Sequence, residues 1–376
     1  MNHLSNRFLH IVSFDVPSPP DYGGVVDVFY KVKALADCGV KIILHCYQYG
    51  RPQSEILSQI CFEVNYYPRL ISKGKLFSRV PYIVCSRSDE RLMFRMQQDQ
   101  YPILMEGLHT TSYLGDERLK NRFVIVRTHN VEHDYYQHLA RTETNLFKKS
   151  YYYSEAIKLE YYESVLKFAN AIAAISPADT KYFQHKYFNT FYLPAFHPNQ
   201  SITAKTGPGT FAFYHGNLAV AENNEAALFL VNHVFISTNH SLVISGSKPS
   251  EELKQAVKAN PKVELRSHDS PDEMLELIAE AHVNILPTFQ STGIKLKLIT
   301  ALFRGRFCIV NAPMIAETGL EDICIVANDA KQMMTEVNAC FKKEFTQIQI
   351  DERKKVLQTR FSNKTNAEHL ISILYK

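Results

Sequence analysis

The stretch FLHIVSFDVPSPPDYGGVVDVFYKVKALADCGVKIILHCY, residues 8–47, decides the fold class. Its first apolar run, Phe8–Phe14, predicts a strand, and a helix is expected over about Val25–Cys38. Gly39 is placed as the left-handed residue that ends such a helix, and Lys41–Tyr47 predicts the next strand. A strand, a helix and a second strand in this order predict a parallel sheet with a right-handed crossover.

The same alternation of apolar runs and helical stretches continues along the 376-residue chain. It predicts further strands at residues 103–105, 123–127, 171–175, 210–214, 241–245, 262–266, 283–286, 307–310 and 324–326. Because these runs are apolar throughout, the sheets are expected to be covered on both faces, which makes the fold α/β.

A boundary between two domains is predicted at Leu193–Gly209, which holds three prolines and two glycines and has no periodicity. The prediction is an N-terminal Rossmann-like domain over residues 1–194, a linker over 195–208 and a C-terminal Rossmann-like domain over 209–350. Ligands bind open α/β sheets beyond the carboxyl ends of the strands. The two parallel sheets are therefore expected to face each other across a central cleft that holds the ligand.

Composition and cysteine usage exclude several classes of protein. With 45% hydrophobic and 21% charged residues, the chain is not intrinsically disordered, and no run approaches the roughly 18 apolar residues of a membrane span. A pI near 8.5 is too mild for a dedicated nucleic-acid-binding protein. The seven cysteines form no CxxC pair, so neither a disulfide framework nor a cysteine zinc site is indicated. With no signal-peptide pattern at its start, the protein is expected to be cytoplasmic.

A block of basic residues between Arg69 and Arg95 faces only Asp89 and Glu90. Its members are Arg69, Lys73, Lys75, Arg79, Arg87, Arg91 and Arg95. Such a block suits anionic ligands or an anionic membrane surface, and the alternative is an ordinary solvated helix face. If it meets a membrane, the contacts are expected at Arg69, Lys73, Lys75 and Arg79, peripherally on the inner membrane face.

Two candidate sites follow strands in the first half of the chain. Gly23 and Gly24 stand before the first helix, where free N–H groups attract an anion and missing side chains allow close approach; the alternative is a simple turn. His129 follows the strand at 123–127 and is expected to donate a hydrogen bond to a substrate hydroxyl or phosphate, unless it only contacts backbone. The motif HNVEH also matches the H-x-x-E-H zinc peptidase pattern, which requires both histidines on one helix.

Two further candidates follow strands in the second half. Gly216 and Asn217 end the strand at 210–214 and permit close backbone approach. The segment Ser291–Gly293 is expected to open a helix whose first turns carry Lys295 and Lys297. A helix N-terminus with two lysines favours phosphate binding, and the alternative is that the lysines only solvate a buried helix.

In order along the chain, these places resemble the GT-B glycosyltransferases, in particular the large retaining family 4. PSPPDYGG (17–24) resembles the glycine-rich loop of that family, and HNVEHDYYQHLA (129–140) resembles its strand-end histidine segment. FANAIAAISPAD (168–179) resembles a further stretch of the same family. YHGNL (214–218) resembles the opening of its C-terminal domain, and STGIKLKLITALFRGRFCIVNAPMIAETGL (291–320) its lysine-bearing helix. The resemblance spans about residues 8–320.

The resemblance implies transfer of a hexosyl unit, of mannosyl or glucosyl type, with retention and without a bound metal or cofactor. The donor would be a UDP- or GDP-sugar, and the acceptor a glycan or lipid-linked molecule of surface polysaccharide synthesis. His129 and Lys297 would be the catalytic residues. The donor-binding residues would be Gly23, Gly24, Gly216, Asn217, Thr292, Gly293, Lys295 and Thr300. The segment 351–376 would form a last helix that returns to the N-terminal domain.

The chain departs from the family at the E-x7-E motif. The second glutamate, which usually holds the ribose hydroxyls, aligns with Thr300, and the first falls near Thr292. A threonine hydroxyl lacks the charge-assisted, two-point grip of a carboxylate. The alternative to an active enzyme is therefore a catalytically silent GT-B scaffold that assists a partner transferase.

Overall fold

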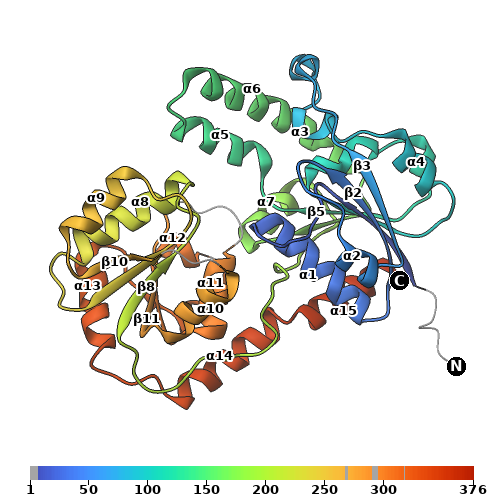
Figure 1. Cartoon of the computed structure of the whole chain (residues 1–376). Helices are drawn as coiled ribbons and strands as arrows, with labels where there is room; N and C mark the ends of the chain where they lie inside the picture. Colours follow the sequence, from blue (N-terminus) through green and yellow to red (C-terminus); the bar gives the residue numbers. More distant parts are fainter. Residues whose placement is uncertain (1–6, 267–269, 290–294, 317) are drawn as a thin grey trace, which may run out of the picture. The chain divides into compact units, whose positions relative to one another are not determined.

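The computed structural model describes residues 7–266, 270–289, 295–316 and 318–376, without the side chains of Lys73 and Pro271. The chain divides into two compact units (Figure 1). Unit 1 comprises Met1–Pro198 and Phe361–Lys376, and unit 2 comprises Asn199–Arg360. The chain passes into unit 2 within the segment expected to be the linker, and it stays there past the expected end at residue 350.

Unit 1 is built on a parallel sheet in which the described residues form seven strands. In spatial order they are β3 (Glu63–Pro68), β2 (Lys41–Gln48), β1 (Phe8–Ser13), β4 (Ile103–Glu106), β5 (Val124–Thr128), β6 (Ala171–Ala174) and β7 (Thr190–Tyr192). The central strands are buried along their whole length, as Leu9 and Ile125 illustrate, because helices cover both faces of the sheet. The strands expected from apolar runs are confirmed, whereas β3 and β7 were not predicted.

Helices and short 3₁₀ turns connect the strands of unit 1. They are α1 (Gly23–Asp37), α2 (Glu55–Ile60), η1 (Lys73–Phe77), α3 (Tyr82–Cys85), α4 (Glu90–Met96), η2 (Leu108–Tyr113), η3 (Glu117–Leu119), α5 (Glu132–Thr142), α6 (Leu146–Tyr162), η4 (Glu163–Phe168) and α7 (Pro177–Lys186). α1 ends as the sequence predicts, because Gly39 has a φ of +83°. Figure 1 shows α5 and α6 lying side by side.

The C-terminal segment corrects a prediction, because residues 351–376 do not form one helix. They contain the end of α14 (Gln347–Arg360), which belongs to unit 2, and α15 (Asn363–Leu374), which belongs to unit 1. The chain breaks at Phe361 and Ser362, where the Ser362 side chain accepts a hydrogen bond from the Thr365 amide and starts a new helix. α15 then packs against α1 in the core of unit 1.

Unit 2 repeats the design with a parallel sheet of six strands among its described residues. In spatial order they are β10 (Val263–Arg266), β9 (Ser241–Ser245), β8 (Phe211–His215), β11 (Val283–Leu286), β12 (Phe307–Val310) and β13 (Ile325–Val326). The connections are α8 (Ala221–Phe229), the short π-helix η5 (Leu230–Val234), α9 (Glu251–Ala259), α10 (Pro271–Glu280), α11 (Leu296–Arg304), α12 (Ala312–Ile315), η6 (Glu321–Ile323) and α13 (Ala330–Cys340). None of the helices in the described residues has the length and apolar character needed to span a bilayer.

Candidate active site

In each sheet the strand order reverses at one point, and that point positions the candidate site. In unit 1, β1 lies between β2 and β4, with His10 opposite Ile103. The chain leaves β1 toward one side of the sheet and β4 toward the other, so the loops after these strands separate at their carboxyl ends. Ligands of open α/β sheets bind at such switch points.

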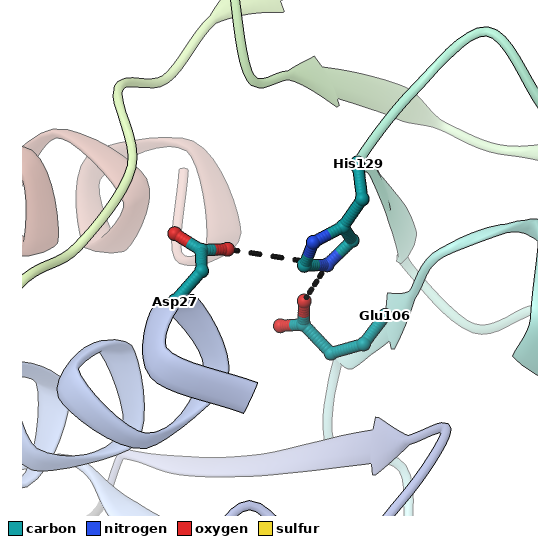
Figure 2. Close-up of side chains that lie close together, drawn as sticks. All are labelled: Asp27, Glu106 and His129. Atoms are coloured by element: carbon teal, nitrogen blue, oxygen red, sulfur yellow. Dashed lines mark hydrogen bonds and ion pairs between the residues drawn. The ribbon is translucent and has the colours of Figure 1, made fainter. Parts of the chain in front are cut away.

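Five charged or polar side chains meet below this edge of unit 1, and we call them the buried charge cluster. They are Asp27 and Lys31 from α1, Glu106 at the end of β4, and Arg127 and His129 at the end of β5. The Lys31 ammonium lies 2.8 Å from Asp27 Oδ2 and 2.8 Å from Glu106 Oε1. His129 donates from Nε2 to Glu106 Oε2 at 3.0 Å, and the same nitrogen lies 3.9 Å from Asp27. Figure 2 shows Asp27, Glu106 and His129 pointing toward one another.

Arg127 completes the cluster on the far side of Asp27. Its Nε and Nη2 donate to the two carboxylate oxygens of Asp27 at 3.2 and 3.1 Å, and its other bonds go to the carbonyls of Leu193 and Pro194. The amide of Phe196 donates to Asp27 Oδ1 at 2.8 Å. One carboxylate on α1 therefore joins β5 to the segment that follows β7.

Opposite charges balance inside the buried charge cluster. Burial alone would raise the pKa of Asp27, but the positive charges of Arg127 and Lys31 hold that pKa below its ordinary value. Burial also opposes ionisation of Glu106, and Lys31 together with the hydrogen bond from His129 lowers its pKa. Both carboxylates are therefore ionised at neutral pH, and each contacts a cation.

The cluster also contains a set of metal-ligand atoms. One atom each of Asp27, Glu106 and His129 lies within 4.8 Å of the others. The Lys31 ammonium already lies against both carboxylates, so a divalent ion would have to displace it. The geometry is that of an ion-pair network in which Lys31 supplies the positive charge.

The motif HNVEH does not bring its two histidines to one site. α5 begins at Glu132, so His129 belongs to the loop after β5, whereas His133 is in the first turn of the helix. His133 Nδ1 lies 3.4 Å from Glu163, and His129 is bound to Glu106. Because the zinc peptidase pattern requires both histidines on one helix, this geometry excludes it.

Further buried polar atoms at the carboxyl edge of unit 1 have no hydrogen-bond partner among the described residues. Two of them, His109 Nδ1 and Glu132 Oε1, lie 3.8 Å apart, and His129 Nδ1 and Thr128 Oγ1 are in the same condition. Gly107, with a φ of +71°, makes the turn that places His109 here, and a Cβ on it would lie 2.8 Å from His109 Nδ1. Buried polar atoms without partners are rare, so these mark a position where water or a ligand completes the bonding.

The two glycines of the first loop play a different part from the expected one. Gly23 and Gly24 are the first residues of α1, with Tyr22 as its N-cap, rather than a loop before a helix at Val25. A Cβ on Gly24 would lie 2.8 Å from the Phe14 ring, so close packing against Phe14 accounts for this glycine. The free N–H groups of the first turn still form an end that attracts anions.

In unit 2, β8 and β11 lie side by side at the corresponding switch point. Gly216 and Asn217 follow β8, and the chain after β11 leads to α11. Lys297, in the first turn of α11, donates from Nζ to Asn223 Oδ1 at 3.1 Å and lies 5.4 Å from the centre of the Tyr214 ring. The lysine on α11 is thus held against the residues that follow β8.

Asn223 connects this lysine to the loop after β8. Its Nδ2 donates to the carbonyl of Asn217 at 3.1 Å, and a Cβ on Gly216 would lie 3.0 Å from its side chain. Burial lowers the pKa of Lys297 to about 8, with Glu222 opposing this shift and Lys295 adding to it. Among the described residues, Asn223 Oδ1 is the one hydrogen-bond acceptor of this half-buried ammonium, which is therefore well suited to receive an anion.

The structure gives fewer contacts for the remaining residues that were predicted to bind the donor. Lys295 immediately precedes α11, which begins at Leu296. The Thr300 hydroxyl accepts a hydrogen bond from the Asn199 side chain at 3.4 Å. Thr292 and Gly293, and with them the expected opening of the helix, lie outside the described residues.

The basic block between Arg69 and Arg95 does not form one surface. Arg91 pairs with Asp89, and Arg95 pairs with Glu63 and Asp99. The Lys75 ammonium donates to the carbonyl of Cys85 at 2.5 Å, and Arg79 is exposed. The Lys73 side chain is outside the described part of the structure. Part of the block is therefore neutralised locally, as expected of an ordinary solvated face.

Comparison with solved structures identifies the architecture. The sucrose-phosphate synthase of Thermosynechococcus elongatus matches with a TM-score of 0.70 at 14% identity, covering 98% of each chain. TarM matches with a TM-score of 0.68 at 8% identity over 100% of each chain. The chain has the GT-B fold. A third GT-B match, an E. coli trehalose-6-phosphate structure bound with UDP-2-fluoro glucose, has a TM-score of 0.62 at 11% identity and covers 98% of each chain.

Sequence comparison adds one relative of this GT-B chain. An uncharacterized 44.6 kDa protein in the cps region of Klebsiella pneumoniae is 26% identical over 339 residues, which cover 85% of this chain and 87% of that protein. No family model matches the chain. The expectation of a GT-B fold with two parallel Rossmann-like sheets is confirmed.

Sequence reasoning about this GT-B chain located His129, Gly216 and Lys297 at strand ends but missed the partners of His129. Asp27, Lys31 and Glu106 were not predicted, although a charged pair four residues apart within the apolar stretch of α1 was a signal. His109 carried no signal in the sequence beyond its position after a strand.

Proposed function

We propose that the protein is a glycosyltransferase that moves a hexosyl unit, of mannosyl or glucosyl type, from a UDP- or GDP-sugar to a glycan or lipid-linked acceptor. The observation that carries this proposal is Lys297, held at the switch point of a GT-B sheet by Asn223. The GT-B match that was bound with UDP-2-fluoro glucose supports a nucleotide-sugar donor. The relative in the cps, or capsule, region supports a part in polysaccharide synthesis.

The chemistry follows from the leaving group, which is a nucleoside diphosphate. As the bond between the sugar C1 and the phosphate oxygen breaks, negative charge grows on the diphosphate, and Lys297, Lys295 and the N-terminus of α11 stabilise it. Gly216 and Asn217 would lie along the donor, with Thr300, Thr292 and Gly293 near it. In a retaining reaction on one face of the sugar, the acceptor oxygen bonds to C1 and its proton passes to the departing phosphate oxygen.

His129 is the proposed catalytic residue of unit 1. Nε2 donates its proton to Glu106, so the opposite nitrogen, Nδ1, is left as an acceptor for a sugar hydroxyl. This role differs from the hydrogen-bond donor expected from the sequence. The buried charge cluster fixes the ring in this orientation. The N-terminal end of α1, with Gly23 and Gly24, is the proposed anion contact in the same unit.

The test is nucleotide binding followed by a screen for donor hydrolysis. Calorimetric titration with UDP and GDP should give a dissociation constant that rises at least tenfold in Lys297→Ala and stays within twofold in Lys258→Ala, a change to an exposed lysine of α9. Hydrolysis of UDP- and GDP-linked glucose and mannose should then identify the donor. Equal binding by both variants would contradict the assignment of Lys297.

A catalytically silent GT-B scaffold is the second candidate, and one observation favours it. Thr300 stands where a carboxylate would hold ribose, and its hydroxyl is engaged by Asn199. A protein that binds neither UDP nor GDP and hydrolyses none of the four donors would fit this candidate. Peripheral contact with an anionic membrane through Arg69, Lys73, Lys75 and Arg79 stays a prediction, and vesicle sedimentation of the corresponding alanine variants would test it.

A further inference from the structure

One arginine of unit 1, Arg87, is buried and forms no ion pair with a carboxylate among the residues that the structure describes. Arg87 is 6% exposed, and its guanidinium donates to the main-chain carbonyls of Phe14 and Ile83, each at 2.7 Å. No ion pair of Arg87 is found among the described residues. The carbonyls satisfy its hydrogen bonds without supplying a full negative charge, and the Asp15 carboxylate acts on the guanidinium only through space. A buried charge with so little compensation is costly.

A second arginine, Arg69, lies within electrostatic range of the first. Arg69 donates from Nε to the Ser86 hydroxyl at 3.1 Å, and its guanidinium stacks on the rings of Tyr49 and Tyr82, at 4.5 and 5.7 Å from their centres. It likewise forms no ion pair within the described ranges. Burial lowers the pKa of Arg87 to about 10, and the charge of Arg69 adds to this shift while the Asp15 carboxylate opposes it.

Two other arginines of the basic block, Arg91 and Arg95, form ion pairs with carboxylates. Arg91 pairs with Asp89 at 2.6 Å, and Arg95 pairs with Glu63 at 2.6 Å. Arg69 and Arg87 have no such partner within the described residues. A bound anion would compensate both charges at once.

A separate observation places other ligand-binding atoms at the same edge. His109 Nδ1 and Glu132 Oε1 are buried 3.8 Å apart, and neither atom has a hydrogen-bond partner in the described part of the chain. The Phe14 ring connects the two places, because it lies 5.4 Å from the His109 ring while the Phe14 carbonyl receives Arg87. Burial raises the pKa of Glu132 to about 7 and, with the charge of Arg87, lowers the pKa of His109 well below its ordinary value. A neutral imidazole and a half-protonated carboxyl group can both form hydrogen bonds with a ligand hydroxyl.

We propose that Arg69 and Arg87 bind a phosphate group of the acceptor at the carboxyl edge of the unit 1 sheet, and that His109 and Glu132 bind a hydroxyl of the same molecule. This inference rests on the proposed function only in calling the ligand the acceptor. Two guanidinium groups match a phosphate, whose oxygens take paired N–H donors and whose charge can reach −2. The position also agrees, since β1 and β4 diverge here.

The test uses soluble phosphates and the full chain. In a Lys297→Ala background, which removes the proposed phosphate contact of unit 2, calorimetry measures binding of α-D-glucose 1-phosphate, inorganic phosphate and glucuronate at constant ionic strength. Arg69→Gln should weaken both phosphates at least tenfold. The matched control is Arg91→Gln, which removes an exposed, paired arginine of the same block and should change affinity less than twofold.

Two further variants separate the parts of the subsite. Glu132→Gln should weaken glucose 1-phosphate, which offers hydroxyls, more than inorganic phosphate, which offers no sugar. Arg87→Lys should weaken both phosphates, because a single ammonium replaces the guanidinium fork. If Arg87→Lys fails to fold, Arg69→Gln and Glu132→Gln still decide the outcome, since Arg69 is only partly buried.

A lipid source of the phosphate is distinguished by vesicles of phosphatidylcholine with and without phosphatidic acid. Sedimentation with phosphatidic acid that is lost in Arg69→Gln but kept in Arg91→Gln would support the same subsite with a lipid headgroup. Equal losses in both variants, or binding of glucuronate without binding of phosphate, would overturn the proposal. UDP binding by the unmodified chain reports the donor site independently, so failure of one assignment is distinguishable from failure of the other.

Discussion

Two aspartates of α1 offer a matched comparison at the scale of single residues. Asp27 and Asp37 each pair with a lysine four positions away, but Asp27 and Lys31 are fully buried, whereas Lys33 and Asp37 are exposed. Asp27→Asn leaves Lys31 and Arg127 with one carboxylate fewer, so we expect a loss of about 3–5 kcal/mol in the free energy of unfolding. Asp37→Asn should cost less than about 1 kcal/mol. Urea unfolding measures both, and similar values would show that the buried charge cluster is not structural.

The pKa of Lys297 predicts how nucleotide binding depends on pH. The ammonium, whose pKa burial lowers to about 8, is charged below that pH and loses its charge above it. Affinity for UDP should therefore fall as the pH rises from 7 to 9.5, with uptake of a proton on binding at the upper end. Lys297→Arg, which stays charged throughout, should remove most of the fall. A pH dependence that is the same in this variant would assign the change to another group.

For single residues, the sequence predicted where along the chain the site residues lie better than which side chains they contact. His129 and Lys297 lie after β5 and at the start of α11 because parallel strands end at one edge. The role of Glu106 could not be predicted, because the residue ends a four-residue strand and resembles any polar residue that follows an apolar run. The burial of Lys31 could not be predicted either, because lysines near an apolar stripe usually extend to solvent. Its contacts with Asp27 and Glu106 form only in the folded chain.

At the scale of elements, the contact between the ends of β8 and β9 depends on a glycine. A Cβ on Gly246 would lie 1.9 Å from the carbonyl oxygen of Gly216 and 2.8 Å from the Leu218 side chain. Gly246→Ala should therefore push these strand ends apart and destabilise the protein by about 1–3 kcal/mol. It should also weaken UDP binding, because the loop after β8 moves.

Gly74→Ala is the matched control for this glycine. Its Cβ would meet only the Ser72 hydroxyl at 3.7 Å, an ordinary contact, so stability and UDP binding should stay unchanged. Thermal unfolding and calorimetry measure the two effects. An unchanged Gly246→Ala would show that the loop after β8 adapts to the added methyl group.

Most of the strands that were predicted are buried along nearly their whole length, and the strands that were missed are only partly buried. β3 is an edge strand with mostly half-buried residues, and β7 is an edge strand of three residues, so neither has a continuous apolar run. The helix expected over 351–376 was divided because Ser362 caps a new helix, although apolar residues continue on both sides. Local capping decided that boundary, and helical periodicity alone did not reveal it.

At the scale of the whole molecule, buried histidines predict the response to acid. Burial lowers the pKa of His10 and of His197 to about 4, whereas the unfolded chain protonates histidine near pH 6.5. The unfolded state therefore binds more protons at these two sites between these pH values, so their contribution to stability is greatest above pH 6.5 and falls as the pH decreases toward 4. The slope is about 1.4 kcal/mol per pH unit for each such histidine.

His197→Gln tests this slope. The variant should lower stability at pH 7.5, because it alters the bond to the Phe361 carbonyl, but its stability should fall less steeply between pH 6.5 and 4. His185→Asn, at an exposed position of α7, should leave the slope unchanged. Urea midpoints at pH 7.5, 6 and 5 decide the matter, and equal slopes in all three proteins would contradict it.

Unit 1 is made of two chain segments, and hydrogen bonds join the end of the first segment to the start of the second. The His197 amide donates to Asn363 Oδ1 at 3.2 Å, and Asn363 Nδ2 donates to the His197 carbonyl at 2.7 Å. The point where the chain leaves unit 1 thus lies beside the point where it returns. In the order of the chain, residues 199–360 therefore stand between the two segments of unit 1. A gene that joins codon 198 to codon 361 through a few glycine and serine codons should encode a folded protein, with His197 and Asn363 closing the splice.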